Sequence, residues 1–517
     1  MFYGVTALVA LVAACWVIVA TRAWGLGVSP DSVAYLTTAE QISEGWGIVP
    51  HGDPTRLATP HYPPLYPMVL AALRTVNEDL RAAARWLHVA LAVLNVLLIA
   101  LLGARAAGRA GGMVAAFVGL NGAVLEAHAW LLSEPLAMTF TLAGLILLPD
   151  GLAPNATPAR RRRFLLWAAL ATGAACLTRY ASLALLASGV LGIFVAARGR
   201  RRQGLIDATT FAVIAIAPLA LWVVRNRFLA DTTVNRRLAW FGFDRHHLEQ
   251  LENTVARWFA LRPSSVVEAL VAVLLAAAGA WTTVIILRRA ATRDAAAVDA
   301  RRRLEFVRVR NAVLVPFIVC YAALVLVTVA FLDRSTPLDA RILLPLQVPL
   351  VVLLVSVAMD LLAPRRRWHA PAVAALLFVV TIGLGRSLTL GRELAVDGHG
   401  FSAGWWAKSQ TVQHVATLPS STVLYSNAPE VLYVHLGRHA HLLPRAYDAD
   451  GARRMRWEDA TVVWFSRYRR GGTLQAEQEF VRRMGLTRTA RLRDGAVYRM
   501  APARPATAPA SNPATRK

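Results

Sequence analysis

Apolar runs long enough to cross a lipid bilayer recur along this 517-residue chain and constrain its fold more than any other feature. A helix needs about 20 consecutive apolar residues to cross the roughly 30 Å hydrocarbon core. Inside lipid every backbone polar group must be satisfied, so such runs predict helices. Eleven are expected, near residues 3–22, 85–102, 111–130, 132–148, 164–178, 180–197, 205–224, 266–287, 311–332, 341–362 and 370–387. The sequence therefore predicts an α-helical polytopic membrane protein.

Arginine supplies most of the net charge of +25, and its distribution predicts the orientation of these helices. The even-numbered connections between the runs hold 21 arginines: Arg105, Arg109, Arg160 to Arg163, Arg198, Arg200 to Arg202, Arg288, Arg289, Arg293, Arg301 to Arg303, Arg308, Arg310 and Arg365 to Arg367. Positive residues accumulate on the cytoplasmic side of membrane helices, so we expect a cytoplasmic N-terminus in a multi-pass inner (plasma) membrane protein. Nucleic-acid binding would instead need basic residues gathered on one soluble face, so no nucleic-acid partner is expected.

Two external segments, 23–84 and 225–265, are too long to be simple turns. After the last apolar run the chain becomes mixed and polar, which predicts a membrane domain over 1–390 and a small external α/β domain over 391–500. Helical patterns at 405–418, 428–436 and 474–484 alternate there with short β-rich runs at 422–425 and 461–465. The Ala- and Pro-rich tail, 501–517, has the composition of a disordered segment.

The three cysteines are expected to be packing residues, since Cys15, Cys176 and Cys320 all lie inside apolar runs without CxxC spacing. The segment before Cys15 resembles a lipoprotein cleavage box. However, no positive residue precedes it and the apolar run continues beyond it, so we expect an uncleaved first helix.

The first candidate for chemistry is Asp31, in the sequence Ser29-Pro30-Asp31-Ser32 just past the first apolar run. A carboxylate at a membrane surface is costly and needs a partner or a function. One interpretation is a general base that takes a proton from an acceptor hydroxyl. The other is the N-cap of a short helix over 32–44, and the residues alone do not choose between them.

A second acid, Glu134, falls in a very short external hairpin between two apolar runs, with Glu126 and His128 one to two turns earlier. Its carboxylate could hold a metal ion, a sugar hydroxyl or an arginine. The alternative is a capping role beside Ser133 and Pro135, although an acid at the membrane face favours a function.

Two isolated external arginines, Arg179 and Arg341, are candidates for binding phosphate. A guanidinium donates two parallel hydrogen bonds to a phosphate and stabilises the charge that develops on a leaving group. The alternative is an interfacial arginine that extends toward lipid headgroups. Arg225 and Arg227 are further candidates of the same kind.

Three side chains in His61-Tyr62-Pro63-Pro64-Leu65-Tyr66-Pro67, namely His61, Tyr62 and Tyr66, are candidates for contact with a sugar. The alternative is an aromatic belt at the membrane interface. No Walker loop, GxSxG elbow, HExxH or Rossmann fingerprint is present, which argues against nucleotide hydrolysis, serine hydrolysis and zinc proteolysis. Without a cytoplasmic nucleotide-binding domain, a sugar donor is expected to be a lipid.

Together these segments resemble the GT-C superfamily of polytopic glycosyltransferases that use polyprenyl-phosphate sugars. The branch that is most similar is glycosyltransferase family 39-like and includes protein mannosyltransferases and lipid A aminoarabinose transferases. The resemblance covers residues 1–390 in layout and rests on Asp31, Pro63-Pro64-Leu65-Tyr66-Pro67, Ser133-Glu134-Pro135, Thr178-Arg179-Tyr180, and Arg341 with Pro345. The run Tyr425-Ser426-Asn427-Ala428-Pro429 also resembles the external domain of such enzymes.

The resemblance implies that Asp31 is the base of an inverting single displacement, and it leaves a divalent metal ion open. Many members carry a second acid directly after this aspartate, where this chain has Ser32. A two-acid site would therefore need Asp53 or Glu134 as its second carboxylate.

The sequence thus favours a membrane glycosyltransferase that moves a sugar from a polyprenyl phosphate to an acceptor outside the inner membrane. The acceptor, whether protein, lipid or polysaccharide, is not indicated. Asp31 would be the base, Glu134 would orient substrate or metal, and the two arginines would hold phosphate. A transporter of lipid-linked sugars would instead need ionisable residues near the midplane, which is nearly free of charge here. A non-catalytic scaffold for envelope assembly is the third alternative.

Overall fold

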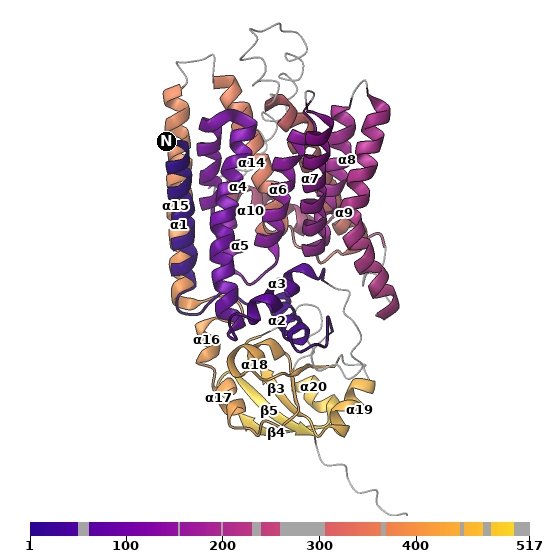
Figure 1. The fold of residues 1–517 in the computed structure, drawn as a ribbon. Coiled ribbons are helices and arrows are strands. Elements are labelled where there is room, and N and C mark those ends of the chain that lie inside the picture. The colour runs from indigo at the N-terminus through magenta and orange to yellow at the C-terminus, as the bar shows by residue number, and fades with distance from the viewer. Residues whose placement is uncertain are drawn as a thin grey trace, which may run out of the picture. The chain divides into compact units, whose positions relative to one another are not determined.

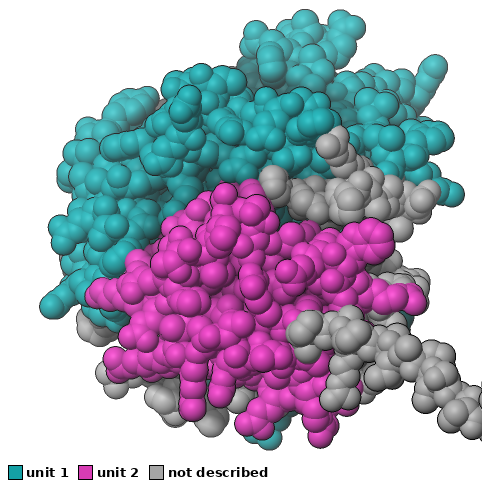
Figure 2. All heavy atoms as spheres, turned by 90° about the horizontal axis from the view of Figure 1, so that it is seen from below, with its two compact units in different colours: residues 1–399 teal, residues 400–517 magenta. Residues whose placement is uncertain are grey.

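The computed structural model describes residues 1–49, 62–153, 156–197, 200–229, 239–258, 306–362, 369–444, 449–468 and 477–500. The chain forms two compact units, Met1–His399 and Gly400–Lys517, which Figure 2 shows in different colours. The first unit is helical, and the second combines helices with a small sheet. The sequence places the change at residue 390, just after the last apolar run, but the helix that carries this run continues to Asp397.

Unit 1 consists of helices of very different lengths, several of which run side by side (Figure 1). They are α1 (Phe2–Ala20), α2 (Pro30–Ser43), α3 (Leu65–Arg74), α4 (Leu80–Ala116), η1 (Phe117–Leu120), α5 (Gly122–Ala129), α6 (Glu134–Gly151), α7 (Pro158–Thr178), η2 (Tyr180–Ser182), α8 (Leu183–Ala196), α9 (Arg201–Leu229), α10 (Arg245–Trp258), η3 (Arg310–Leu314), α13 (Val315–Val327), η4 (Thr328–Leu332), α14 (Ala340–Leu362) and α15 (His369–Asp397).

Five of the described helical stretches are long and apolar enough to cross a membrane. They are Phe2–Ala20, Leu80–Leu120, Arg201–Leu229, Phe306–Leu332 and Ala340–Leu361. The chain is therefore a membrane protein, and its fold class is as predicted. The number of eleven spans stays a prediction, since the expected span at 266–287 lies outside the described residues.

The longest helix, α4, is two helices joined at a sharp break, because Ala107 and Gly108 leave helical geometry. Gly108 has a φ of 74°, a conformation that glycine adopts without steric cost. The expected spans 85–102 and 111–130 are thus one hairpin, whose second arm continues through η1 and α5. The sequence interpretation did not include the further interruption near Asn121, where α5 begins.

The segment after α1 is tied to the connection between α5 and α6 by a short parallel bridge. The backbone N–H of Gly27 donates to Ala129 at 2.8 Å, and Leu131 donates back to Gly27 at 2.9 Å. A side chain at Gly27 would strike the ring of Trp130, so only glycine allows this approach. The bridge brings the start of α2 beside the start of α6, while α2 and α3 lie across one end of the bundle (Figure 1).

Unit 2 contains a mixed five-stranded sheet, as a small α/β domain requires. Its strands are β1 (Leu424–Ser426), β2 (His441–Leu442), β3 (Thr461–Phe465), β4 (Leu486–Arg491) and β5 (Gly495–Met500), in the order β2-β1-β3-β5-β4. Strands β1, β2 and β3 are parallel, and β5 pairs antiparallel with β3 and β4. The helices are α16 (Gly404–Ala407), α17 (Gln410–Ala416), α18 (Pro429–Leu436), α19 (Ala449–Trp457) and α20 (Glu477–Met484). The sequence interpretation missed the β4–β5 hairpin because β4 is mostly exposed and polar.

The close crossing of α8 and η3 generates a testable prediction about packing. A Cβ atom added at Gly192 would collide with the backbone carbonyl oxygen of Ala312, which side-chain rotation cannot relieve. We expect Gly192→Ala to destabilise the protein by about 1–3 kcal/mol, the usual effect of overpacking a core. Thermal unfolding in detergent measures this loss. Gly4→Ala is the control, since Gly4 is exposed and a methyl group added there would have no neighbour within 4 Å; equal midpoints for both variants would contradict the prediction.

Candidate active site

Asp31 is not the cap of α2, because Ser29 fills that position. The Ser29 hydroxyl accepts from the Ser32 backbone N–H at 3.2 Å, and the Ser32 hydroxyl accepts from the Ser29 N–H at 3.0 Å. This reciprocal capping box, followed by proline at the first helical position, starts the helix two residues earlier than expected. The N-cap interpretation of Asp31 is therefore wrong. Ser32 is used in the cap.

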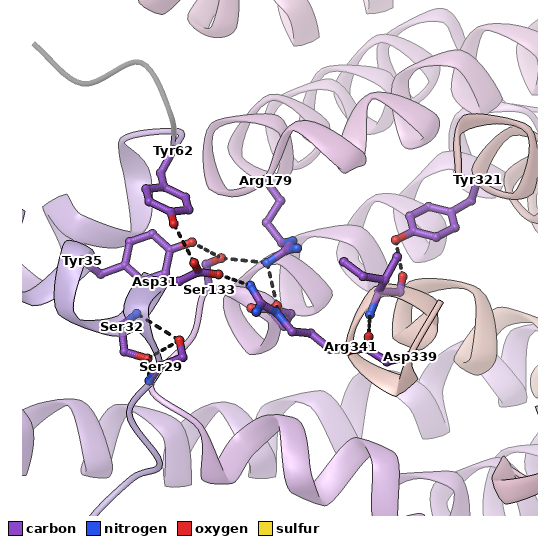
Figure 3. Close-up of polar contacts among 12 residues, drawn as sticks. Ser29, Asp31, Ser32, Tyr35, Tyr62, Ser133, Arg179, Tyr321, Asp339 and Arg341 are labelled. Carbon is purple, nitrogen blue, oxygen red and sulfur yellow. Dashed lines mark hydrogen bonds and ion pairs between the residues drawn. The ribbon is translucent and has the colours of Figure 1, made fainter. Parts of the chain in front are cut away.

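The Asp31 carboxylate lies between a tyrosine and an arginine from distant parts of the chain (Figure 3). The Tyr62 hydroxyl donates to Oδ1 at 2.6 Å, and Nη2 of Arg341 donates to Oδ2. Both oxygens are therefore occupied by donors, which fixes the plane of the carboxylate. Three-quarters of the Asp31 side chain is removed from solvent, with a relative exposure of 25%.

Glu134 is the first residue of α6 and one of the most deeply buried acids, with a relative exposure of 3%. Its Oε1 accepts from Nη1 of Arg179 at 2.7 Å and also from Nε of Arg341. Its Oε2 is buried and has no hydrogen-bond partner among the described residues. One oxygen of Glu134 thus organises two arginines, while the other is buried.

The two acids and two arginines form what we call the charge cluster: Asp31, Glu134, Arg179 and Arg341. Arg341 contacts both carboxylates and connects α2 to α6. Burying a charge is strongly unfavourable unless an opposite charge and hydrogen bonds compensate for it. Two negative and two positive charges cancel here, which allows all four groups to lie together at the ends of apolar helices.

Local capping interactions position the two arginines. Asp339 caps α14 by accepting from the Ile342 N–H at 3.0 Å, and the Tyr321 hydroxyl donates to the Ile342 carbonyl at 2.6 Å (Figure 3). Arg341 is therefore held in the first turn of its helix. Arg179 follows the last residue of α7 and also donates to the Ser133 hydroxyl at 3.3 Å.

The tyrosines next to Asp31 pack edge to face. The ring of Tyr35 lies 4.9 Å from that of Tyr62 and 5.0 Å from that of Tyr66, and its hydroxyl is 3.2 Å from the Ser133 hydroxyl. Tyr66 is fully buried and bonded to His88 at 2.8 Å, so direct contact with a sugar does not fit its position. Tyr62 contacts Asp31, and His61 lies outside the described residues.

Sequence reasoning missed Tyr35 and Ser133 as neighbours of the charged groups. A signal for Tyr35 was present, since residues four apart lie on the same face of a helix and Tyr35 follows Asp31 by four. For Ser133, sequence reasoning considered only a cap, whereas its hydroxyl meets Tyr35 and Arg179. That role depends on tertiary contacts.

The remaining candidates lie apart from the charge cluster in their described contacts. Arg225 donates to the Ile48 carbonyl at 3.4 Å, and Arg227 is an exposed residue of α9. Glu126 is 4.0 Å from His399, whereas His128 is buried within α5. Asp53 lies outside the described residues. Within the part of the chain that the structure describes, no three His, Cys, Asp or Glu side chains are grouped as a metal site.

The surroundings of Asp31 keep it ionised. Burial raises the pKa of its carboxyl, but the charge of Arg341 and the hydrogen bonds from Tyr62 and Arg341 together outweigh burial and hold the pKa below its usual range. Burial and the charge of Asp31 raise the pKa of Tyr62, which therefore stays protonated and remains a donor. The ionised Asp31 carboxylate thus accepts a hydrogen bond from the neutral phenol of Tyr62.

Comparison with known proteins identifies the fold. No protein-family model and no curated protein sequence matches the chain. ArnT from Cupriavidus metallidurans, bound to undecaprenyl phosphate, matches with 17% identity and a TM-score of 0.55 over 96% of this chain and 98% of that chain. The archaeal oligosaccharyltransferase AglB from Archaeoglobus fulgidus matches with 12% identity and a TM-score of 0.52, over 89% of this chain and 69% of that one.

The arabinofuranosyltransferase AftD from Mycobacteria matches with 17% identity and a TM-score of 0.59, over 96% of this chain and 40% of that one. All three are GT-C proteins. The chain therefore has the GT-C membrane fold, and the resemblance inferred from its short motifs is confirmed at the level of the fold. The shared fold does not by itself assign a role to the charge cluster.

Replacing Tyr62 by Phe tests the hydrogen bond to Asp31 through its dependence on pH. The variant should be less stable than the wild type by about 1–3 kcal/mol at neutral pH, as expected for a hydrogen bond to a charged group. Because the folded pKa of Asp31 is lowered, its stabilising contribution exists above the unfolded value of about 3.9 and disappears as pH falls through the folded value. The difference between variant and wild type should therefore shrink on acidification.

Thermal unfolding in detergent at neutral and acidic pH measures this difference. Tyr3→Phe is the control, because Tyr3 is a highly exposed tyrosine of α1. A Tyr62→Phe penalty that is the same at every pH would show that the phenol stabilises the fold without acting on the Asp31 carboxylate.

Proposed function

We propose that this protein is a glycosyltransferase that moves a sugar from a polyprenyl-phosphate donor to an acceptor at the external face of the inner membrane. The observation that carries the proposal is the bridge of Arg341 between Asp31 and Glu134. The bridge places Arg341, a candidate phosphate-binding group, against Asp31, the candidate base, on a GT-C fold. The similar ArnT structure contains bound undecaprenyl phosphate, which supports a lipid-linked donor.

Arg179 and Arg341 would bind the phosphate of the donor. Both guanidiniums come from helix ends, where a lipid headgroup is within reach, and both already interact with Oε1 of Glu134. A phosphate offers oxygens with the same geometry as a carboxylate and a greater negative charge. We infer that Arg341, about a third of whose side chain is exposed, shares its hydrogen bonds with the donor phosphate.

Asp31 would accept the proton from the attacking acceptor. As the acceptor oxygen forms a bond to the anomeric carbon, its proton passes to the Asp31 carboxylate and the bond from that carbon to the phosphate oxygen breaks. The electron pair leaves with the polyprenyl phosphate, whose charge the two arginines stabilise. A single displacement of this kind inverts the anomeric carbon. Tyr62 would keep the carboxylate oriented.

Donor binding would also change the basicity of Asp31. Paired with Arg341, its carboxylate has a lowered pKa and is a weak base. When Arg341 turns part of its charge toward a phosphate, the pKa of Asp31 rises toward that of an effective proton acceptor. Base activation would then follow occupation of the donor site.

Glu134 would act on the donor through Arg179 and Arg341, which its Oε1 holds, because its Oε2 is buried. A divalent metal that bridged the two acids would have to displace Arg341, whose charge already lies between them. The proposed reaction therefore uses arginine in that position and has no step through a metal ion.

Asp31→Asn tests the assignment of the base. We expect transfer to fall by about 10²- to 10⁴-fold, since the amide keeps the shape but cannot take the proton. Membranes containing each variant are incubated with a panel of radiolabelled undecaprenyl-phosphate sugars, and the label in acceptor and in released polyprenyl phosphate is measured. Binding of undecaprenyl phosphate should be retained.

The control is Glu78→Gln, which neutralises an exposed acid between α3 and α4. It should transfer sugar at the wild-type rate. Wild-type turnover by Asp31→Asn would refute Asp31 as the base, and failure of the wild-type chain to transfer any sugar in the panel would refute the proposed function.

A further inference from the structure

A line of hydrogen-bonded residues, linked through side chains and one backbone carbonyl, is buried near the charge cluster, and the proposed reaction does not use it. We call it the buried polar chain; it consists of Tyr66, His88, His128, Asn95 and Thr139. These residues come from α3, α4, α5 and α6, and none is more than 9% exposed. Polar groups this deep in a helical membrane protein are costly unless each is satisfied.

The backbone carbonyl of His128 determines which atoms donate and which accept in the two hydrogen bonds of His88. His88 Nδ1 is 3.2 Å from the backbone oxygen of His128, and a carbonyl can only accept, so Nδ1 carries the hydrogen. In a neutral ring Nε2 is then an acceptor, and the Tyr66 hydroxyl donates to it at 2.8 Å. His88 is completely buried, which disfavours the charged ring, and it links α3 to α5 as a neutral side chain.

The same reasoning orients the second histidine. His128 Nδ1 is 2.7 Å from the Val124 carbonyl and must donate to it, so Nε2 accepts from the Asn95 amide at 3.0 Å. The remaining amide hydrogen of Asn95 points to the Pro135 carbonyl at 3.0 Å, and its Oδ1 accepts from the Thr139 hydroxyl at 2.8 Å. Asn95 has no alternative orientation that satisfies these partners.

Both ends of the buried polar chain reach the neighbours of Glu134. At one end, the Asn95 amide donates to the carbonyl of Pro135, the residue directly after Glu134, and the Thr139 hydroxyl lies 3.0 Å from the same oxygen. At the other, the ring of Tyr66 packs against Tyr35, whose hydroxyl contacts Ser133 on the other side of Glu134. Both residues next to Glu134 are thus contacted by side chains outside the cluster: Ser133 through its hydroxyl and Pro135 through its carbonyl.

We propose that Asn95, His88 and Thr139 are positioning residues that set the location of Glu134, and through it the two arginines that receive the donor phosphate. This inference rests on the proposed function. A functional group must be held to within about 0.5 Å to act, and hydrogen-bonded residues behind it supply that precision. Neutral, fully satisfied partners serve this purpose without adding charge beside the cluster.

Two substitutions at Thr139 separate positioning from packing. Thr139→Val keeps the shape but removes the hydroxyl that orients Asn95, whereas Thr139→Ser keeps the hydroxyl. We expect Thr139→Val to weaken binding of undecaprenyl phosphate about fivefold, the value of one modest hydrogen bond, and Thr139→Ser to restore it. Asn95→Leu removes the hydrogen bonds of Asn95 to His128, Pro135 and Thr139. It should weaken binding of undecaprenyl phosphate more, with a matching fall in sugar transfer.

The probe is undecaprenyl phosphate in detergent micelles, and thermal unfolding is recorded for each variant. Thr172→Val is the matched control, since Thr172 is also buried but, among the described residues, its hydroxyl donates to the Ala168 carbonyl of its own helix. It should lower stability as much as Thr139→Val without changing affinity for undecaprenyl phosphate.

Two results would overturn the inference. If Thr139→Val and Asn95→Leu bind undecaprenyl phosphate and transfer sugar as well as Thr172→Val does, the buried polar chain is structural only, while the proposed function stands. If the wild-type chain neither binds undecaprenyl phosphate nor transfers sugar, the proposed function is refuted, and this inference with it.

Discussion

The interaction on which the rest of the site depends is the contact of Arg341 with both Asp31 and Glu134. These partners are 310 and 207 residues away in sequence, so no local pattern brings them together. Each charge alone would be costly at the end of an apolar helix, and the cost falls only when opposite charges meet. Electrostatic compensation therefore requires α2, α6 and α14 to converge.

The charge cluster and the buried polar chain complement each other physically. The cluster is ionic and partly open to solvent, so an anionic ligand can compete for its arginines. The chain beneath it is neutral, closed and satisfied, so it resists rearrangement. The transfer that we propose would need both properties, because the donor phosphate would have to exchange with a carboxylate while the groups around it keep their positions.

Much of the candidate site could be predicted from the sequence, and the reason is the cost of charge in a membrane. Asp31, Glu134, Arg179 and Arg341 stand out because acids and isolated arginines are rare beside apolar runs. Aromatic residues are common at interfaces and carry no such signal, which is why Tyr66 was assigned to a sugar and Tyr35 was missed. Ser29 looked unremarkable, yet its capping bond frees the Asp31 side chain to meet Arg341.

The sequence by itself determined that the chain is a helical membrane protein, because hydrophobic length and backbone hydrogen bonding leave few alternatives in lipid. It also indicated the fold through the order of short motifs at the ends of the apolar runs. Only the tertiary structure decided which charges pair, which residues contact the neighbours of Glu134, and how His88 and Asn95 are hydrogen-bonded. Those choices depend on contacts between helices, and the apolar pattern that predicts each helix does not specify its neighbours.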